Sequence, residues 1–279
     1  MPDVHAIYAQ LMARQRAWAD SREIEIDADG RLARWDENLL SPASSRTRAE
    51  LAGGSPACSV AHDKPGRLHD LGSGLALAAN VFEPWRASPE DLASRVPELG
   101  RAFSRIGFAT QLPLHASDDS GEDLVADVDV LLDGAPAGAT AVVPLFSEPF
   151  TDVDPRVRDL LARDASRFGE LPGCALLARD LHSNPRRFRR LAVGRVLETA
   201  LAMSRRFGRH GFRIAVLWFD AGGRASRQIQ AELDRLRMRI GGEVDLSATS
   251  WQALCERLHE APSQDHRYTR SLQARYFDS

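Results

Sequence analysis

Apolar residues recur at helical spacing in the first third of the chain. In residues 4–19, Ile7 and Leu11 belong to an apolar stripe of helical period, which predicts an amphipathic opening helix. Residues 75–85 predict a helix that ends at a proline, and residues 88–99 predict a second short helix with a serine and a proline at its start. This third of the chain is therefore expected to be mainly helical.

The period changes in the middle of the chain. Residues 107–116, 123–134 and 139–150 are rich in β-branched and apolar residues and are separated by short turn-like links, which predicts an antiparallel meander. The continuous apolar run 214–219 is typical of a strand buried on both faces. Further helices are expected over 153–169, 184–208, 224–239 and 250–259. Helices around such strands predict an α/β fold on a mixed sheet.

Composition limits the classes of function. The formal net charge of −3 gives no global reason to bind nucleic acid, so such binding would need a local basic patch. The three cysteines lack CxxC spacing, which argues against a disulfide framework and a structural zinc site. The same cysteine pattern favours a reducing cytoplasm, and no window approaches the roughly 18 apolar residues of a membrane span, so we expect no membrane partner.

Lysine is almost absent from the chain. The 36 basic residues include a single lysine, Lys64, and the remainder are arginines. Arginine stays protonated and cannot replace a titrating amine, so a mechanism that needs lysine has one candidate only.

Carboxylates alternate along the second β-rich run. Asp127, Asp129 and Asp133 fall on one face of the predicted strand, and Glu148 comes at the end of the next strand. Carboxylates on adjacent strand ends suit Mg²⁺, with Asp129, Asp127 and Glu148 as ligands. The alternative is a half-exposed strand whose acidic face lies in water.

Three segments resemble a known superfamily. They are LGSGLALAANVFEPW (71–85), ADVDVLLDG with AVVPLFSEPF (126–150) and FRIAVLWFD (212–220), which carry Asn80, Asp129, Glu148 and Asp220. Together with the predicted order of elements, they resemble the PD-(D/E)xK nuclease superfamily, within it a group of bacterial restriction-endonuclease-like proteins. The resemblance implies a three-layer α/β/α core over residues 101–245, a helical N-terminal extension over 1–100, and a C-terminal helix and tail over 246–279. Whether that tail is mobile or docks on a partner stays open.

The catalytic pattern of that superfamily is incomplete here. Where it has Glu-x-Lys on the third strand, the chain has Val143-Pro144-Leu145, and the proline predicts a strand at a sheet edge or one that is locally broken. On the following helix, Arg195 and Glu198 align with the Gln and Lys of the family. Asp129 is the residue that persists, with Glu148 and Asp127 nearby in sequence.

The resemblance therefore predicts a catalytically inactive or impaired nuclease-fold protein, a pseudoenzyme associated with nucleic acid, with DNA as the partner. One alternative is an active Mg²⁺-dependent DNA endonuclease whose relocated site uses Asp129, Glu198 and Arg195, with Glu148 beside them. Another is a protein-interaction module that kept the fold. Mg²⁺ is the expected cofactor of the active form, and none is expected otherwise.

A dense basic segment precedes the predicted long helix. In a nucleic-acid-binding protein these arginines would contact phosphates; alternatively, they are solvated residues of an arginine-rich chain. The candidate residues are Arg186, Arg187, Arg189 and Arg190.

Overall fold

The computed structural model describes residues 4–53, 66–100, 102–117, 123–134, 138–151, 161, 165–260 and 266–277. Lys64 and most of the predicted helix over 153–169 lie outside these ranges. The longer helices are α1 (Val4–Asp20), α2 (Ser45–Ala52), α3 (Gly74–Phe82), α4 (Pro89–Arg95), α6 (Pro172–Ser183), α7 (Val193–Phe207), α8 (Gly223–Ile240), α9 (Trp251–His259) and α10 (His266–Leu272). Short helical turns are η1 (Trp35–Asn38), η2 (Arg67–His69), η3 (Glu83–Ala87), η4 (Pro97–Leu99), η5 (Glu148–Phe150), η6 (Ala165–Phe168), η7 (Pro185–Arg187) and the π-helical η8 (Gln273–Phe277).

The described strands form one mixed sheet in the order β1-β2-β3-β4-β5. The antiparallel part is the predicted meander, because β1 pairs with β2 and β2 pairs with β3 in opposite directions. The chain then crosses over through α7 and adds β4 parallel to β3 and β5 parallel to β4. The α/β class and the mixed sheet predicted from the sequence are confirmed. The strands are β1 (Arg105–Ser117), β2 (Asp123–Asp133), β3 (Ala139–Leu145), β4 (Phe212–Trp218) and β5 (Asp245–Ser250).

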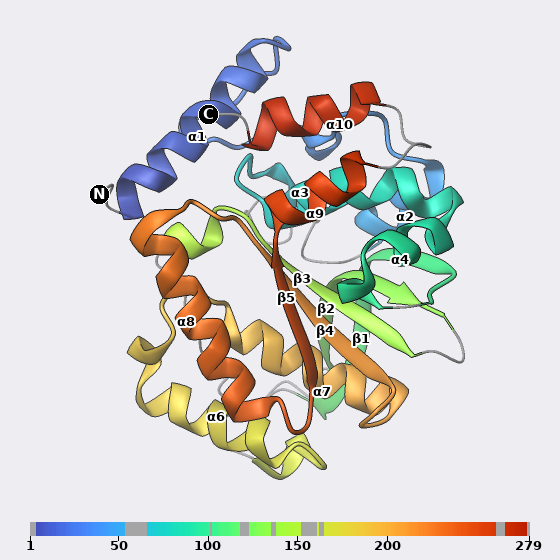
Figure 1. The fold of residues 1–279 in the computed structure, drawn as a ribbon, viewed down its shortest axis with the longest axis vertical. Coiled ribbons are helices and arrows are strands. Elements are labelled where there is room, and N and C mark those ends of the chain that lie inside the picture. The colour runs from blue at the N-terminus through green and yellow to red at the C-terminus, as the bar shows by residue number, and fades with distance from the viewer. Residues whose placement is uncertain are drawn as a thin grey trace.

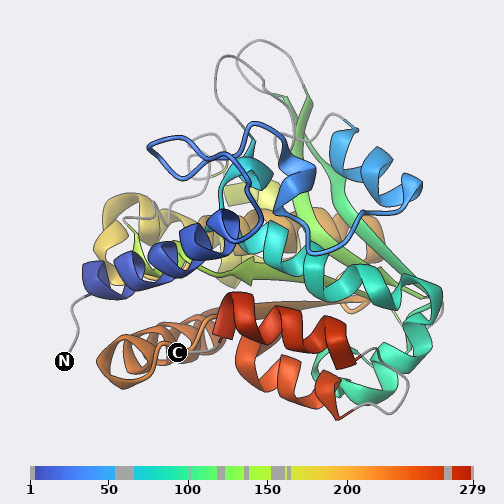
Figure 2. The same ribbon diagram turned by 90° about the horizontal axis from the view of Figure 1, so that it is seen from above.

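Helices cover both sides of the sheet. In Figure 1 strand β5 passes in front of α7, which packs against β1, β2, β3 and β4. Helix α3 packs against β2 and β3, and Figure 2 shows the C-terminal helices α9 and α10 (red) on the side of the sheet away from α7. The sheet is therefore buried between two helical layers, which explains why β3 is apolar on both faces.

The prediction that the third strand lies at a sheet edge is wrong, and the predicted break at its proline is found on one side only, because the pairing with β4 continues through Pro144 and the pairing with β2 does not reach it. Strand β3 is central and continuous, and Pro144 stands opposite Leu217 of β4. The pairing of β3 with β2 ends at Val142, so Pro144 follows the last β2–β3 pair. A proline is accommodated there because that side of the strand needs no further N–H donor.

The predicted helix over 184–208 is also wrong in its first third. Pro185–Arg187 forms only the short turn η7, and α7 does not begin until Val193. The buried carboxylate of Glu232 on α8 accepts the backbone N–H groups of Arg189, Arg190 and Leu191 at 3.0, 2.9 and 3.2 Å. Since the backbone donors of residues 189–191 already have a partner, this segment is held as an irregular loop against α8.

The C-terminal segment docks on the N-terminal helix, which settles the open question of the tail for residues 266–277. Figure 1 shows the C-terminus beside α1. The side chain of Arg275 is buried, with its guanidinium carbon 3.4 Å from the ring centroid of Trp18. Its Nε donates to Gln15 Oε1 at 2.9 Å, and its Nη1 donates to the Asn38 carbonyl at 2.8 Å. Burial lowers the pKa of Arg275 to about 10, so it remains charged at neutral pH.

Candidate functional site

Asp129 is the buried centre of the candidate site. Its side chain is only 1% exposed, and its two carboxylate oxygens form separate ion pairs with Arg67 and Arg195. The two arginine side chains are 36% and 32% exposed, so they lie between the buried carboxylate and solvent. Asp129 therefore does not belong to a water-facing acidic strand surface.

Three separate parts of the chain build this cluster, called here the Arg–Asp–Arg cluster (Arg67, Asp129 and Arg195). Asp129 comes from β2, Arg195 from the first turn of α7, and Arg67 from η2, just before α3. Because α7 packs across β2, its first turn brings Arg195 over the strand. The cluster thus depends on the crossover that makes the sheet mixed.

The two arginines keep Asp129 ionised. Burial acts to raise the pKa of this carboxyl, but the charges of Arg195 and Arg67 and their hydrogen bonds outweigh burial and hold the pKa below its ordinary value. Arginine itself stays protonated at any physiological pH. The cluster therefore supplies fixed charges and hydrogen-bond donors but no group that exchanges protons near pH 7.

Glu148 lies beside the cluster, but on the turn η5 rather than on a strand as the sequence predicted. Its carboxylate accepts the N–H of Gly74 at 3.1 Å and that of Phe146 at 2.6 Å. Gly74 starts α3 so close to β3 that a Cβ there would lie 2.5 Å from the Pro144 carbonyl oxygen. Burial raises the pKa of Glu148, and the charge of Arg195 and the N–H donors offset only part of that effect.

The raised pKa of Glu148 predicts a distinctive pH dependence. Above about pH 4.3, the ordinary value for glutamate, the unfolded chain loses its proton while folded Glu148 retains it until its own higher pKa is reached. Folding of the wild type is therefore progressively disfavoured across that window. We expect Glu148→Gln, which does not titrate, to gain stability relative to the wild type as the pH rises above about 4.3. Urea unfolding at a series of pH values measures this difference.

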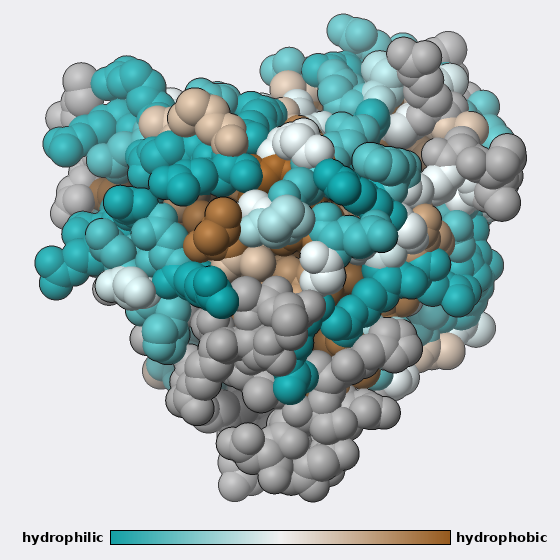
Figure 3. Space-filling view, turned by 90° about the horizontal axis from the view of Figure 1, so that it is seen from below, coloured by the Kyte–Doolittle hydropathy of each residue, from teal (hydrophilic) through white to brown (hydrophobic). Residues whose placement is uncertain are grey.

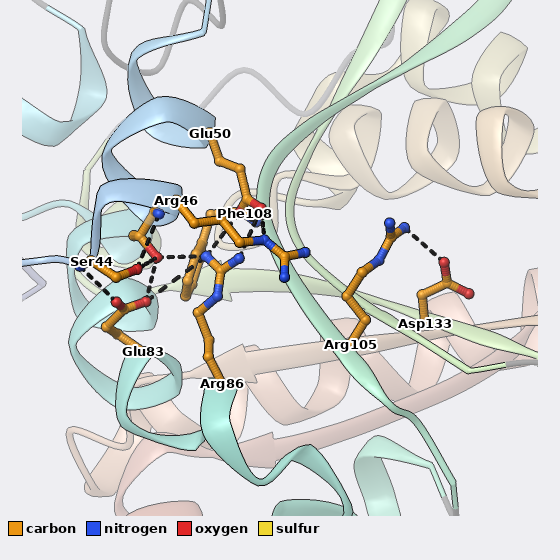
Figure 4. A network of polar contacts seen from close by, with 9 residues as sticks. Ser44, Arg46, Glu50, Glu83, Arg86, Arg105, Phe108 and Asp133 are labelled. Carbon is orange, nitrogen blue, oxygen red and sulfur yellow. Dashed lines mark hydrogen bonds and ion pairs between the residues drawn. The ribbon is translucent and has the colours of Figure 1, made fainter.

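Glu50 provides a control, because its pKa is shifted downward, in the direction opposite to that of Glu148. Burial acts to raise its pKa, but hydrogen bonds from Arg86 and the Phe108 N–H outweigh it and lower the pKa. Figure 4 shows Arg86 directed at Glu50 and, further along the sheet, Arg105 paired with Asp133. Glu50→Gln should lose stability relative to the wild type as the pH rises toward about 4.3, with no trend above it. Parallel pH trends for the two variants would contradict the assignment for Glu148.

The residues of the site do not fit Mg²⁺. A magnesium ion needs carboxylate oxygens with free lone pairs directed at one point. Here Asp129 is engaged by two guanidinium groups and Glu148 by two backbone donors. Within the described part of the chain, no three His, Cys, Asp or Glu side chains are grouped so that they could hold a metal ion.

The other sequence-predicted acids take different places. Asp127 is half-buried on the same face of β2, where Gln111 Nε2 lies 3.4 Å from its carboxylate, and its charge acts on both arginines of the cluster. Glu198 is half-buried on α7, one turn after Arg195, and Arg195 is the residue that reaches Asp129. Of the predicted metal ligands, Asp129 is thus paired with two arginines, Glu148 with two backbone N–H groups, and Asp127 lies beside Gln111.

Two further residues of the resemblance have structural roles. Asn80 lies at the junction of the two chain ends, where its Oδ1 accepts the Leu40 N–H at 2.7 Å and its Nδ2 donates to the Tyr276 hydroxyl at 2.9 Å. Asp220 accepts the Gly222 N–H at 2.8 Å and a hydrogen bond from Ser226 at the start of α8. Neither residue belongs to the Arg–Asp–Arg cluster.

The basic segment lies outside the cluster but next to it. Arg186, Arg187 and Arg189 are exposed, whereas Arg190 is half-buried and donates to the Pro149 carbonyl at 3.2 Å. Since Pro149 directly follows Glu148, this hydrogen bond joins the arginine loop to the turn that carries the second buried acid. Arg187 is paired with Asp180.

Arg67 is the site residue that the sequence did not reveal. It belongs to no apolar pattern, and none of the segments that carry the resemblance contains it. The composition gave a general indication, because arginine is by far the most abundant basic residue available to pair with a buried acid in this chain. Nothing in the sequence indicates which arginine fills that role.

A separate cavity of about 300 Å³ lies at the opposite end of β3, where that strand begins. Its charged lining residues, Arg213 and Asp245, are paired with each other at 2.7 Å.

Figure 3 shows the face on the side of α6 and α7, where hydrophilic residues dominate and apolar ones occur in small groups between them. The described helices include none that is both long and apolar enough to cross a membrane.

Comparisons with known proteins do not assign a family. The chain matches no protein-family model, no curated protein and no solved structure. The functional argument therefore depends on the geometry of the Arg–Asp–Arg cluster and its surroundings.

Proposed function

We propose that this chain is a nuclease-fold protein that binds nucleic acid, with DNA as the first candidate, and does not cleave it efficiently. The topology supports the proposal: three antiparallel strands, a crossover helix and a parallel fourth strand are compatible with the restriction-endonuclease-like core that the sequence resembles. Asp129 lies on the second strand of that core, as the resemblance implies.

One observation carries the proposal: both oxygens of the Asp129 carboxylate are paired with guanidinium groups. Metal-dependent phosphodiester cleavage needs that carboxylate as a metal ligand, so that the ion can activate water and stabilise the charge on the phosphate. Two fixed cations in that position provide charge for a phosphate without activating a nucleophile. Arg67 and Arg195 each use one Nη group on Asp129 and are one-third exposed, which leaves donors available toward solvent.

The alternative of a relocated active site receives less support. In that arrangement Arg195 would act as a charge clamp on the substrate, beside a metal held by Asp129 and Glu198. Arg195 instead neutralises Asp129 itself, which lowers the affinity of that carboxylate for a cation. The third possibility is a protein-interaction module on the same fold.

Binding and cleavage of labelled nucleic acid, measured together, test the proposal. Single- and double-stranded DNA and RNA would be incubated with the protein in Mg²⁺, Mn²⁺ or EDTA. We expect binding that is independent of the metal and weakens with salt, and no accumulation of cleaved product above an EDTA control. Arg67→Ala with Arg195→Ala tests whether the cluster contributes to affinity.

Two results would overturn the proposal. Metal-dependent cleavage that Asp129→Ala abolishes would establish an active nuclease. Absence of binding to every nucleic acid at low salt would leave the protein-interaction module as the remaining hypothesis.

A further inference from the structure

We propose that Glu232 is a positioning residue that holds two groups of arginines as one surface for the phosphate backbone of nucleic acid. This surface, called here the arginine ridge, comprises Arg186 and Arg189 of the loop before α7 and Arg224, Arg227 and Arg235 of α8. The inference rests on the proposed function and specifies where the nucleic acid would bind.

The loop is fixed to α8 at two neighbouring points. The Glu232 carboxylate accepts three consecutive backbone N–H groups, those of Arg189, Arg190 and Leu191, at 2.9 to 3.2 Å. About one helical turn away, the Arg235 guanidinium lies 5.7 Å from the Phe188 ring centroid and donates to the Arg187 carbonyl at 2.6 Å. Phe188 is buried, so the loop turns its aromatic side chain inward.

This anchoring leaves arginine side chains pointing to solvent. Arg186 and Arg189 are exposed on the loop, and Arg224, Arg227 and Arg235 are exposed on α8. On the helix, positions 224, 227, 231 and 235 follow one another at spacings of three and four, so they share a face. From Arg224 to Arg235 this face extends for about 17 Å, at about 1.5 Å per residue.

Two carboxylates near the ridge, those of Asp180 and Asp234, have basic partners outside it. Asp180 pairs with Arg187 and Arg239, and Asp234 pairs with Arg237. The carboxylate of Asp220, just before α8, accepts the Gly222 N–H and a hydrogen bond from Ser226. Within the described residues, Arg186, Arg189, Arg224 and Arg227 form no ion pair. The ridge is thus a local excess of positive charge on a chain whose formal net charge is −3.

A polyanion with regularly spaced charges suits this surface better than an apolar partner. Guanidinium groups bind phosphates through paired N–H donors, and rigidly presented arginines lose less side-chain freedom on binding. The hydrogen bond from Arg190 to Pro149 connects the ridge to the turn beside the Arg–Asp–Arg cluster. The loop of the ridge is therefore attached to the turn that carries Glu148.

The test is the salt dependence of DNA binding by matched variants of the full chain. Two ridge variants, Arg186→Ala with Arg189→Ala and Arg224→Ala with Arg227→Ala, remove exposed side chains only. Each should weaken binding roughly tenfold or more near 100 mM salt and reduce the slope of log K against log salt by about two. The control is Arg34→Ala with Arg46→Ala. It removes two exposed arginines, one just before η1 and one on α2, and α2 lies far from α8 in Figure 1. This control should change neither the affinity nor the slope.

Glu232→Gln tests positioning directly. Its carboxamide accepts fewer of the three N–H groups, so amide hydrogen exchange at 189–191 should accelerate while thermal unfolding remains cooperative. The variant should also lower the salt slope although it removes no arginine. Unchanged exchange or an unchanged slope would overturn the role of Glu232.

The outcomes separate this inference from the proposed function. DNA binding that is insensitive to both ridge variants would overturn the ridge and leave the proposed function standing. No binding by the wild type, or binding to anionic vesicles alone, would overturn both. If Glu232→Gln does not fold, the two ridge variants still decide whether the ridge binds DNA.

Discussion

Replacing Asp129 with asparagine is expected to lower the free energy of unfolding by about 3 kcal/mol. The substitution keeps the shape of the side chain, so it creates no cavity. It removes the negative charge that neutralises Arg67 and Arg195, and it places an amide N–H₂ against their donors. The estimate takes the lower end of the range for broken buried ion pairs because both arginines are about one-third exposed, at 36% and 32%.

The matched control is Asp133→Asn, two pleats along the same face of β2. Asp133 also pairs with an arginine, Arg105, at 2.8 Å, but the two side chains are 31% and 54% exposed. Such a pair contributes at most about 1 kcal/mol. Denaturant unfolding of both variants measures the contrast, and equal losses would show that burial of the Arg–Asp–Arg cluster does not matter.

The loss of stability in Asp129→Asn should also depend on pH, and in the direction opposite to that expected for Glu148→Gln. Because the pKa of Asp129 is lowered in the folded state, its contribution is fully present above the unfolded value of about 3.9 and is lost as the pH falls through the folded value. The difference between the wild type and Asp129→Asn should therefore shrink in acid. A difference that stays constant down to pH 2 would exclude the charge as its origin.

Removing the whole cluster should cost less than removing its centre. In Asp129→Leu with Arg67→Met and Arg195→Met, no unpaired charge remains and the volumes are roughly kept. Replacement of a buried ionic group by apolar residues is often close to neutral. The combined variant should therefore be more stable than Asp129→Asn, and its DNA affinity should report the contribution of the two guanidinium groups to binding.

Replacing Arg275 with alanine is expected to cost about 3 kcal/mol as well, for a different reason. Among the described residues Arg275 has no acidic partner: its charge is held by the Gln15 side chain, the Asn38 carbonyl and the Trp18 ring. Truncation removes the packing on Trp18 and leaves buried acceptors without donors. Because these contacts join residues 275 and 15, the loss should appear as undocking of the C-terminal segment.

Amide hydrogen exchange over α10 and denaturant unfolding together measure this effect. The control is Arg270→Ala, an exposed arginine on the neighbouring turn of α10, for which a change within about 0.5 kcal/mol is expected. Faster exchange in α10 is expected for Arg275→Ala only. Protection that persists in that variant would show that other contacts hold the segment, such as the packing of Tyr276 against Phe146, with ring centroids 5.3 Å apart.

The elements with strong periodic patterns were predictable from the sequence. Helix α1, the meander β1–β3, the buried strand β4 and helices α8 and α9 all lie where their apolar positions indicate. Strand β5 was not predictable, because it is a half-exposed edge strand, DLSATS, without an apolar run. Its backbone pairing with β4 stabilises the strand, although its own sequence has no apolar run to predict it.

The loop before α7 illustrates a different limit. Residues 184–192 form the first part of the predicted helix over 184–208. The backbone N–H groups of residues 189–191 instead bind Glu232, more than 40 residues later in the chain. A local pattern contains no information about such a partner. For the same reason Pro144 indicated an edge strand, although the early end of the β2–β3 pairing allows it in the centre of the sheet.

By itself, the sequence determined the α/β class, the alternation that places Asp129 on one face of β2, and the lack of a lysine on the third strand, because these follow from local spacing and composition. Only the tertiary structure decided what surrounds Asp129. Burial in a sheet covered on both sides requires a counter-charge, and the folded chain supplies it from η2 and α7, 62 and 66 residues away. Partners at such separations are selected by packing and by the desolvation of charge, which act only once the chain is folded.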